Sequence, residues 1–292
     1  MMATRTIAPA KINWTLEVLR RRGDGYHEVR SVMQTIDLHD DVRTEPAGSL
    51  TLHIEGPHTA SDDDHTLAAA RLLGEAAGRA PATAIAVRKR IPVGAGLGGG
   101  SSDAAAVLRA LDRMWGLDIE TERLARMAAA IGSDAPFFVY GGTALAEGRG
   151  ERVTPLPEIA RKWLLLVVPP LVLPNKTRRM YHALRPRDFS DGSHTRALAD
   201  HIRGGKAPDD DDLYNAFEGA ALESFAGLAS YRESLLRAGA RRVHLAGSGP
   251  ALFAVFASED SVREVAARLE AADASVLVAS TLAAGEATAV EG

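Results

Sequence analysis

The sequence predicts an α+β fold built from two domains. Its 292 residues exceed what one hydrophobic core usually organises, so one large or two medium domains are expected. Strand-like and helix-like segments follow each other in runs, without the regular strand–helix–strand alternation of a doubly wound parallel sheet. The apolar run 163–168, WLLLVV, opens a new unit. We therefore expect the two domains to cover residues 1–156 and 157–292.

The start of the chain predicts strands. Residues 6–20 mix apolar alternation with a proline at position 9, which predicts a strand, a turn and a second strand. Further strands are expected where apolar and polar residues alternate, over 31–43, 51–56 and 83–89. The polar stretch 56–66 predicts a loop whose Asp and Thr residues cap a helix over 67–78.

The strongest helix signal covers residues 102–115, where apolar residues recur at i, i+3, i+4 and i+7. Gly116 suits the C-terminal cap of this helix. A second helix is expected over 121–131. Residues 133–150 then predict a short helical turn followed by a hairpin-like pair of strands.

The second half of the chain mixes both kinds of element. Helices are expected over residues 177–184, 213–225, 228–238 and 259–271. Strands are expected over residues 163–168, 243–247, 251–257 and 275–281. The polar stretch 186–212 predicts a loop-rich segment.

The composition excludes several classes of protein. Hydrophobic residues make up 46% of the chain and charged residues 25%, which is the balance of a folded protein. The 34 Lys and Arg residues against 38 Asp and Glu residues give a net charge of −4, so nucleic acid is not an expected partner. With no cysteine, the chain has no disulfide, thiolate metal site or cysteine nucleophile. A membrane-spanning helix needs about 20 consecutive apolar residues, and no apolar run in the chain is nearly that long. We therefore expect a cytoplasmic protein without a membrane partner.

Residues 92–103, PVGAGLGGGSSD, carry the strongest functional signal. Five glycines in seven residues stand between an expected strand and the strongest expected helix. Glycine lets the backbone approach a ligand closely, and a helix N-terminus offers unpaired N–H groups and positive dipole charge. The pattern predicts a phosphate site, at which Ser101 or Ser102 could give an oxygen to magnesium. The alternative is a flexible turn, which leaves the entropy cost of ordering these glycines unexplained.

Two better-known nucleotide motifs do not fit this loop. Glycines 94, 96 and 99 match the spacing of the dinucleotide fingerprint. That fingerprint needs a strand with a ribose-binding acid after the helix, whereas a second helix is expected here. The Walker A pattern, which requires Ser or Thr after Gly-Lys, is absent.

Three polar residues near these segments have two interpretations each. Lys11, in the apolar segment APAKIN, either points outward to solvent or binds an anion. Asn13 is similarly ambiguous. Asp134, which stands two residues before a proline, suits the cap of a helix and equally suits a functional carboxylate.

Tyr26 and His27 form an adjacent aromatic pair in the segment GYHE. The pair suits core packing, or a site that stacks on a nucleobase and hydrogen-bonds to it. A zinc helix is excluded because position 31, where a second histidine would be required, is a serine. Residues 247–250, GSGP, suit a tight turn between two strands or part of a ligand site.

Three motifs in this order resemble the GHMP kinases: APAKIN at 8–13, PVGAGLGGGSSDAA at 92–105 and LAGSGPALFAVF at 245–256. The similarity spans nearly the whole chain. DGYHE at 24–28 and GSDAPFF at 132–138 narrow it to the member that acts on a cytidine diphosphate-linked methylerythritol. The resemblance implies an ATP- and Mg²⁺-dependent kinase that phosphorylates the 2-hydroxyl of this small molecule, in isoprenoid precursor synthesis by the methylerythritol phosphate pathway.

The resemblance also implies an architecture. The N-terminal domain is similar to ribosomal protein S5, and the C-terminal domain is similar to a ferredoxin-like βαββαβ unit. ATP and the substrate are expected to meet in the cleft between them. No oligomeric state is predicted.

The resemblance further implies roles for individual residues. Asp134 aligns with the catalytic aspartate, which accepts the proton of the attacking hydroxyl, and Lys11 aligns with the catalytic lysine, which keeps that aspartate ionised. ATP is expected on Lys89, Pro92, Gly94, Ala95, Gly96, Leu97, Gly98, Gly99, Gly100, Ser101 and Ser102. The substrate is expected on Asn13, Tyr26, His27, Thr177, Tyr181, Gly247, Ser248 and Gly249, with Tyr26 and His27 at the cytosine.

The chain departs from the family pattern at two places. His65 stands where members often have an Asn near the adenine, so the adenine contact is left open. The segment 215–218, NAFE, lacks an aspartate that members often carry. Three alternatives are another GHMP kinase of the homoserine or mevalonate type, a dinucleotide-dependent oxidoreductase, and a nucleotide-binding member without turnover.

Overall fold

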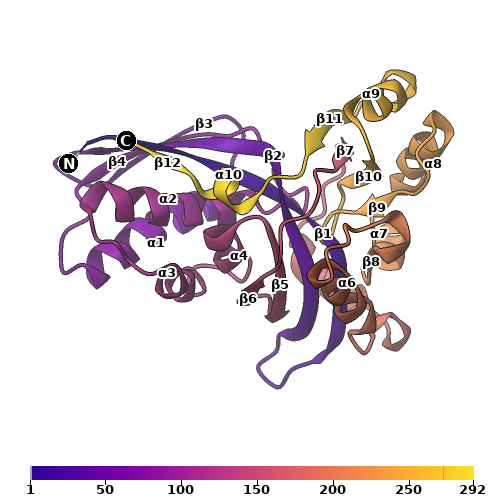
Figure 1. Cartoon of the computed structure of the whole chain (residues 1–292), viewed down its shortest axis with the longest axis horizontal. Helices are drawn as coiled ribbons and strands as arrows, with labels where there is room; N and C mark the ends of the chain where they lie inside the picture. Colours follow the sequence, from indigo (N-terminus) through magenta and orange to yellow (C-terminus); the bar gives the residue numbers. More distant parts are fainter. Residues whose placement is uncertain (1, 272) are drawn as a thin grey trace.

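Two long strands run through the centre of the computed structural model, which describes residues 2–271 and 273–292 (Figure 1). β1 (Thr4–Arg21) and β2 (His27–Pro46) pair antiparallel along their whole length. The turn predicted at Pro9 was wrong, because β1 continues through it. The register shifts between Pro9 and Ala10 instead, so a local irregularity absorbs the proline, which has no N–H to give to the ladder.

The first sheet is built around this pair and has the order β12-β1-β2-β4-β3, with β5 and β6 attached to β2 and β8 attached to β1. Its other strands are β3 (Thr51–Glu55), β4 (Thr83–Arg88), β5 (Thr143–Gly148), β6 (Arg152–Pro155), β8 (Tyr214–Asn215) and β12 (Val290–Glu291). The strands predicted over 31–43, 51–56 and 83–89 are confirmed. A hairpin follows α4 as expected, but its second strand, β6, lies beyond the predicted range 133–150.

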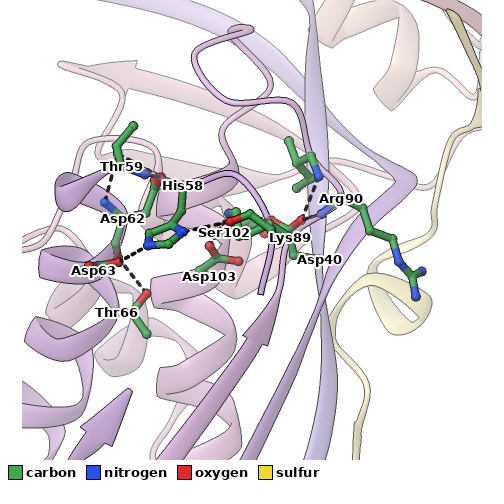
Figure 2. Close-up of polar contacts among 12 residues, drawn as sticks. Asp40, His58, Thr59, Asp62, Asp63, Thr66, Lys89, Arg90, Ser102 and Asp103 are labelled. Atoms are coloured by element: carbon green, nitrogen blue, oxygen red, sulfur yellow. Dashed lines mark hydrogen bonds and ion pairs between the residues drawn. The ribbon is translucent and has the colours of Figure 1, made fainter. Parts of the chain in front are cut away.

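The helices that share the core of this sheet include α1 (Ala60–Ala76), α2 (Gly99–Trp115), α3 (Thr121–Ala128) and α4 (Ala135–Tyr140). The apolar stripe of α2 packs against β1 and β2 and is buried except at its last residue, Trp115, which is half-buried. Gly116 ends the helix in the left-handed conformation, as predicted. α1 begins before the predicted residue 67. Its N-cap is Thr59, whose backbone N–H donates to the Asp62 carboxylate in a capping box (Figure 2).

The second sheet is antiparallel and has the order β11-β7-β10-β9. Its strands are β7 (Trp163–Val168), β9 (His244–Leu245), β10 (Leu252–Phe256) and β11 (Ser275–Ser280). Its helices are α5 (Lys176–Ala183), α7 (Glu218–Ser224), α8 (Leu228–Ala238) and α9 (Glu259–Arg268). Strand, helices, two strands, helix and strand follow in the βαββαβ order that the resemblance implied. The predicted α+β class is confirmed.

One long helix was missed. α6 (Ser193–Arg203) lies in the stretch 186–212, which we expected to be loop-rich, between short 3₁₀ turns at Pro186–Asp188 and Asp210–Asp212. Its buried residues Thr195, Leu198, Ala199 and Ile202 keep helical spacing, which the polar surroundings obscured.

The end of the chain returns to the first sheet. α10 (Ala284–Thr288) leads into β12, where Glu291 pairs with Arg5 of β1, so the two termini lie close together (Figure 1). The two-domain division at residue 156 stays a proposal. This boundary lies between the end of β6 at Pro155 and the start of β7 at Trp163. The C-terminal strand β12 nevertheless returns to the first sheet, where it pairs with β1. None of the helices in the described part of the chain has the length and apolar character needed to cross a membrane.

Candidate active site

A cavity of about 1450 Å³ lies where the two sheets meet. Its walls come from β1, the tip of the β1–β2 hairpin, the glycine loop 92–101, the segment before α4, the start of α5 and the loop 247–248. This volume exceeds the usual range for one small ligand and can hold two ligands side by side.

Nearly all the predicted site residues line this one cavity. Those that line it are Lys11, Asn13, Tyr26, His27, Lys89, Pro92, Gly94, Ala95, Gly96, Leu97, Gly98, Gly99, Gly100, Ser101, Asp134, Thr177, Tyr181, Gly247 and Ser248. Gly249 is buried just behind the wall. Ser102 is fully buried, and its hydroxyl donates to the Pro9 carbonyl at 2.7 Å, so it fastens α2 to β1 and does not face the cavity.

The glycine loop depends on residues without a side chain. Gly96 has φ +92°, and a Cβ built there would lie 2.2 Å from the carbonyl oxygen of Ala246. Gly98 has φ +82°, and its Cβ would lie 2.7 Å from the Phe138 ring. The loop is thus pressed between α4 and the second sheet while its backbone borders the cavity. Since α2 starts at Gly99, the unpaired N–H groups of this long helix are available to an anion.

Lys89 directly follows β4 and fixes the start of this loop through ion pairs with buried carboxylates. Its Nζ lies 2.7 Å from Asp40 Oδ2 and 2.5 Å from Asp103 Oδ2, and both carboxylates are fully buried (Figure 2). The other Asp40 oxygen accepts the N–H groups of Arg90 and Ile91 at 2.5 and 2.8 Å. Two carboxylates therefore already neutralise the Lys89 charge, although its side chain borders the cavity.

The pKa values of this cluster follow from burial and charge. Burial raises the pKa of Asp103 to about 7; Lys89 opposes this shift and Asp40 adds to it. Burial alone would lower the pKa of Lys89, but the charges of Asp103 and Asp40 outweigh it and raise that pKa. One lysine thus compensates the charge of two buried acids, and either carboxylate would be very unfavourable in this site without a partner.

Lys11 and Asp134 meet at the wall of the cavity. Lys11 is buried on β1, and its Nζ donates to Asn13 Oδ1 at 2.7 Å and lies 3.9 Å from Asp134 Oδ2. Asn13 is itself held by Ser31, whose hydroxyl accepts from the Asn13 amide at 2.8 Å. Burial lowers the pKa of Lys11, and the negative charge of Asp134 partly offsets this effect. The solvent-facing orientation of Lys11 is therefore excluded.

The Asp134 carboxylate does not cap the helix that follows it. Asp134 is the N-cap residue of α4 by position, but its side chain makes no capping hydrogen bond. Its side chain is 40% exposed, which leaves it accessible from the cavity. Since the carboxylate is not used to cap the helix, it remains available as a proton acceptor beside Lys11.

The other end of the cavity is aromatic. His27 stacks on Tyr181 with ring centroids 4.6 Å apart, and Tyr181 meets Phe217 edge-on at 5.0 Å. Tyr26 is 52% exposed at the hairpin tip, with the Arg149 guanidinium 4.7 Å from its ring centroid. Burial, with smaller contributions from Arg21 and His182, lowers the pKa of His27, so the neutral ring is favoured. This arrangement suits a flat heteroaromatic ring.

Sequence reasoning missed several cavity residues. Arg149 and Lys176 line the wall, and neither had been given a role. Asn215 lies in the NAFE segment already noted, and its amide donates to the carbonyls of Leu245 and Gly247 at 2.9 and 2.8 Å. It therefore positions the 247–249 loop. His65, whose role was left open, also borders the cavity.

Comparison with known proteins agrees with this geometry. The family model of the GHMP kinases N terminal domain matches residues 64–142, and that of the GHMP kinases C terminal matches residues 206–274. A 4-diphosphocytidyl-2-C-methyl-D-erythritol kinase of Dehalococcoides mccartyi is 43% identical over 262 residues, covering 89% of this chain and 91% of the relative. A protein of the same name from Pelotomaculum thermopropionicum is 41% identical over 284 residues, covering 96% and 98%.

Solved structures give the same result. The crystal structure of a 4-(cytidine 5'-diphospho)-2C-methyl-D-erythritol kinase matches with a TM-score of 0.79 and 36% identity, covering 95% of this chain and 98% of that one. A homoserine kinase from Cytophaga hutchinsonii matches with a TM-score of 0.75 at 17% identity, which shows a shared fold alone. The family models, the close relatives and the structural match together confirm the resemblance, and the chain belongs to the GHMP kinase family.

Proposed function

We propose that the protein transfers the γ-phosphoryl group of ATP to the 2-hydroxyl of 4-diphosphocytidyl-2-C-methyl-D-erythritol, giving the 2-phosphate and ADP. One observation carries the proposal: the glycine loop, the Lys11–Asp134 pair and the aromatic end around Tyr26 and His27 share a single cavity. The relatives at 41–43% identity are named for this activity. The reaction belongs to isoprenoid precursor synthesis by the methylerythritol phosphate pathway.

The chain supplies positioning and charge for this reaction. Backbone N–H groups of the glycine loop hold the ATP phosphates at the start of α2. Asp134 accepts the proton of the 2-hydroxyl as its oxygen bonds to the γ-phosphorus and the bond to the β-phosphate oxygen breaks. Lys11 stabilises the ionised Asp134 and the charge near the attacking oxygen. Lys89 contributes by holding the entry of the loop in place.

The substrate occupies the remaining wall. Tyr26 and His27 recognise the cytosine by stacking and hydrogen bonding, with Tyr181 beside them. Asn13, Thr177 and Tyr181 contact the methylerythritol or the cytidine part. The loop from Gly247 to Gly249, including Ser248, closes the site next to Lys11, and a Cβ at Gly247 would lie only 3.1 Å from the Lys11 amine.

Magnesium is part of the proposal. Mg²⁺ commonly binds through substrate phosphates and waters with only one or two protein ligands. No cluster of three or more His, Asp or Glu side chains suited to a metal occurs among residues 2–271 and 273–292. Ser101 faces the cavity at the start of α2 and fits a magnesium ion shared with the phosphates, whereas the Ser102 hydroxyl is used by Pro9. When bound, the ion neutralises phosphate charge.

The proposal is tested by ADP release from Mg-ATP. Four acceptors are offered side by side: 4-diphosphocytidyl-2-C-methyl-D-erythritol, mevalonate, homoserine and galactose. Release with the cytidine compound alone is expected, because only that acceptor uses the aromatic end of the cavity. Release with another acceptor would remove the cytosine role of Tyr26 and His27.

A further inference from the structure

Lys176 connects two loops that belong to different sheets. It is the first residue of α5, and its Nζ donates to the carbonyl of Gly94 at 2.8 Å and to the carbonyl of Gly249 at 2.6 Å. Gly94 is part of the glycine loop, and Gly249 follows β9 in the second sheet. One side chain therefore holds the proposed ATP loop against the proposed substrate loop, across the cavity that it lines.

The charge of this ammonium is not neutralised by a carboxylate. Lys176 is partly buried, and within the described residues no Asp or Glu side chain lies at ion-pair distance from it. Lys89, by contrast, is matched by two carboxylates. Lys11 and Lys176 together face Asp134, so this part of the cavity has one more positive charge than negative charge.

Such an excess is costly in a partly dry site unless an anion compensates it. The phosphates of a nucleotide on the adjacent glycine loop are anions of this kind. Burial lowers the pKa of Lys176 to about 8, and Lys11 adds to this shift while Asp134 opposes it. Burial thus disfavours the protonated form of Lys176, and a bound phosphate would stabilise that form.

We propose that Lys176 is a positioning residue for phosphoryl transfer, which fixes the glycine loop relative to the 247–249 loop and adds its positive charge at the phosphate end of the cavity. This inference rests on the proposed function. The two contributions are separable, because a neutral amine keeps two N–H donors and can still bridge the Gly94 and Gly249 carbonyls. Loss of the proton removes the charge and spares the bridge.

The test compares Lys176→Met, which removes bridge and charge, with Lys176→Arg, which keeps a permanent charge. Lys206→Met is the matched control, since Lys206 is exposed. Affinity for a non-hydrolysable ATP analogue is measured by calorimetry, and kcat and KM for ATP are measured by ADP release. Lys176→Met should weaken analogue binding and lower kcat/KM for ATP by about ten- to a hundredfold, the effect of losing charge-assisted hydrogen bonds. The control should match the wild type.

A pH profile separates the charge from a merely structural role. Lys11 from β1 and Asp134 before α4 face Lys176, and Arg178 lies on its own helix, so the alkaline decline of kcat/KM belongs to Lys11 and Lys176 together. Lys176→Arg should move that decline to higher pH, because a guanidinium stays protonated. An unchanged profile in the arginine variant, or wild-type analogue affinity in Lys176→Met, would overturn the inference. Since analogue binding needs no acceptor, failure of the proposed substrate would leave the binding comparison of Lys176→Met with the wild type intact.

Discussion

Replacement of Lys89 by Met removes the cation that two buried carboxylates share. Asp40 and Asp103 would then face each other without compensation, and both side chains are fully buried. Removing one partner of a buried ion pair costs about 3–5 kcal/mol. Against a total stability of about 5–15 kcal/mol, this is a large share, and it lowers the folded-to-unfolded ratio by a factor of about 10²–10⁴.

Urea unfolding at pH 8 measures this loss directly, with Lys206→Met as the control for removing an exposed lysine. The control should change the free energy of unfolding by less than about 0.5 kcal/mol. A loss near the control value in Lys89→Met would refute the reasoning, because it would mean that the two acids do not need the lysine.

The pH dependence of the same variant adds a second check. The pKa of Asp103 is about 7 in the folded protein and 3.8 in the unfolded reference, so its contribution to stability is present below pH 3.8 and is lost as pH rises through about 7. Without Lys89 the acid holds its proton more firmly. The Lys89→Met penalty should therefore be smaller at pH 5 than at pH 8, and an equal penalty at both would contradict the shared-charge account.

Three further changes test the site itself. Asp134→Asn should lower kcat by about 10²–10⁴-fold and leave substrate binding largely intact, since a positioned base contributes about that factor; near-wild-type turnover in a coupled assay would remove Asp134 from the chemistry. Tyr26→Ala should raise KM for the cytidine substrate by about one to two decades, because stacking contributes about 1–3 kcal/mol per base, and an unchanged KM would exclude a cytosine contact. Gly96→Ala should abolish tight binding of an ATP analogue in calorimetry, because its Cβ would lie 2.2 Å from the Ala246 oxygen. Gly48→Ala, which meets nothing within 4 Å, should bind as the wild type does.

Elements with a strong local pattern could be predicted from the sequence. The apolar stripe of α2 and its closing Gly116 combine periodicity with a cap, and the structure confirms both. α6 was missed because its four buried residues are separated by charged ones in a polar stretch. The return of β12 to β1 was missed for a different reason, since a two-residue strand has no periodicity and forms only because its partner is there.

In the candidate site, too, residues in a local sequence pattern could be predicted, whereas residues brought together only by the tertiary fold could not. The glycine loop was recognisable because its phosphate-binding chemistry requires consecutive residues. Lys11 and Asp134 lie far apart in the sequence, and the family resemblance was needed to pair them before the structure placed them 3.9 Å apart. Lys176 and Arg149 could not be found this way, because each acts through groups that only the tertiary fold brings near.

The most direct test of the central claim is identification of the product. Wild-type protein is incubated with Mg-ATP and 4-diphosphocytidyl-2-C-methyl-D-erythritol, and the product is examined by ³¹P NMR. Carbon 2 bears a methyl group and no hydrogen, so phosphorylation there should give a new phosphomonoester signal without splitting by a carbinol proton, in step with ADP release. A phosphomonoester split by carbinol protons, or no new signal despite bound ATP, would contradict the account.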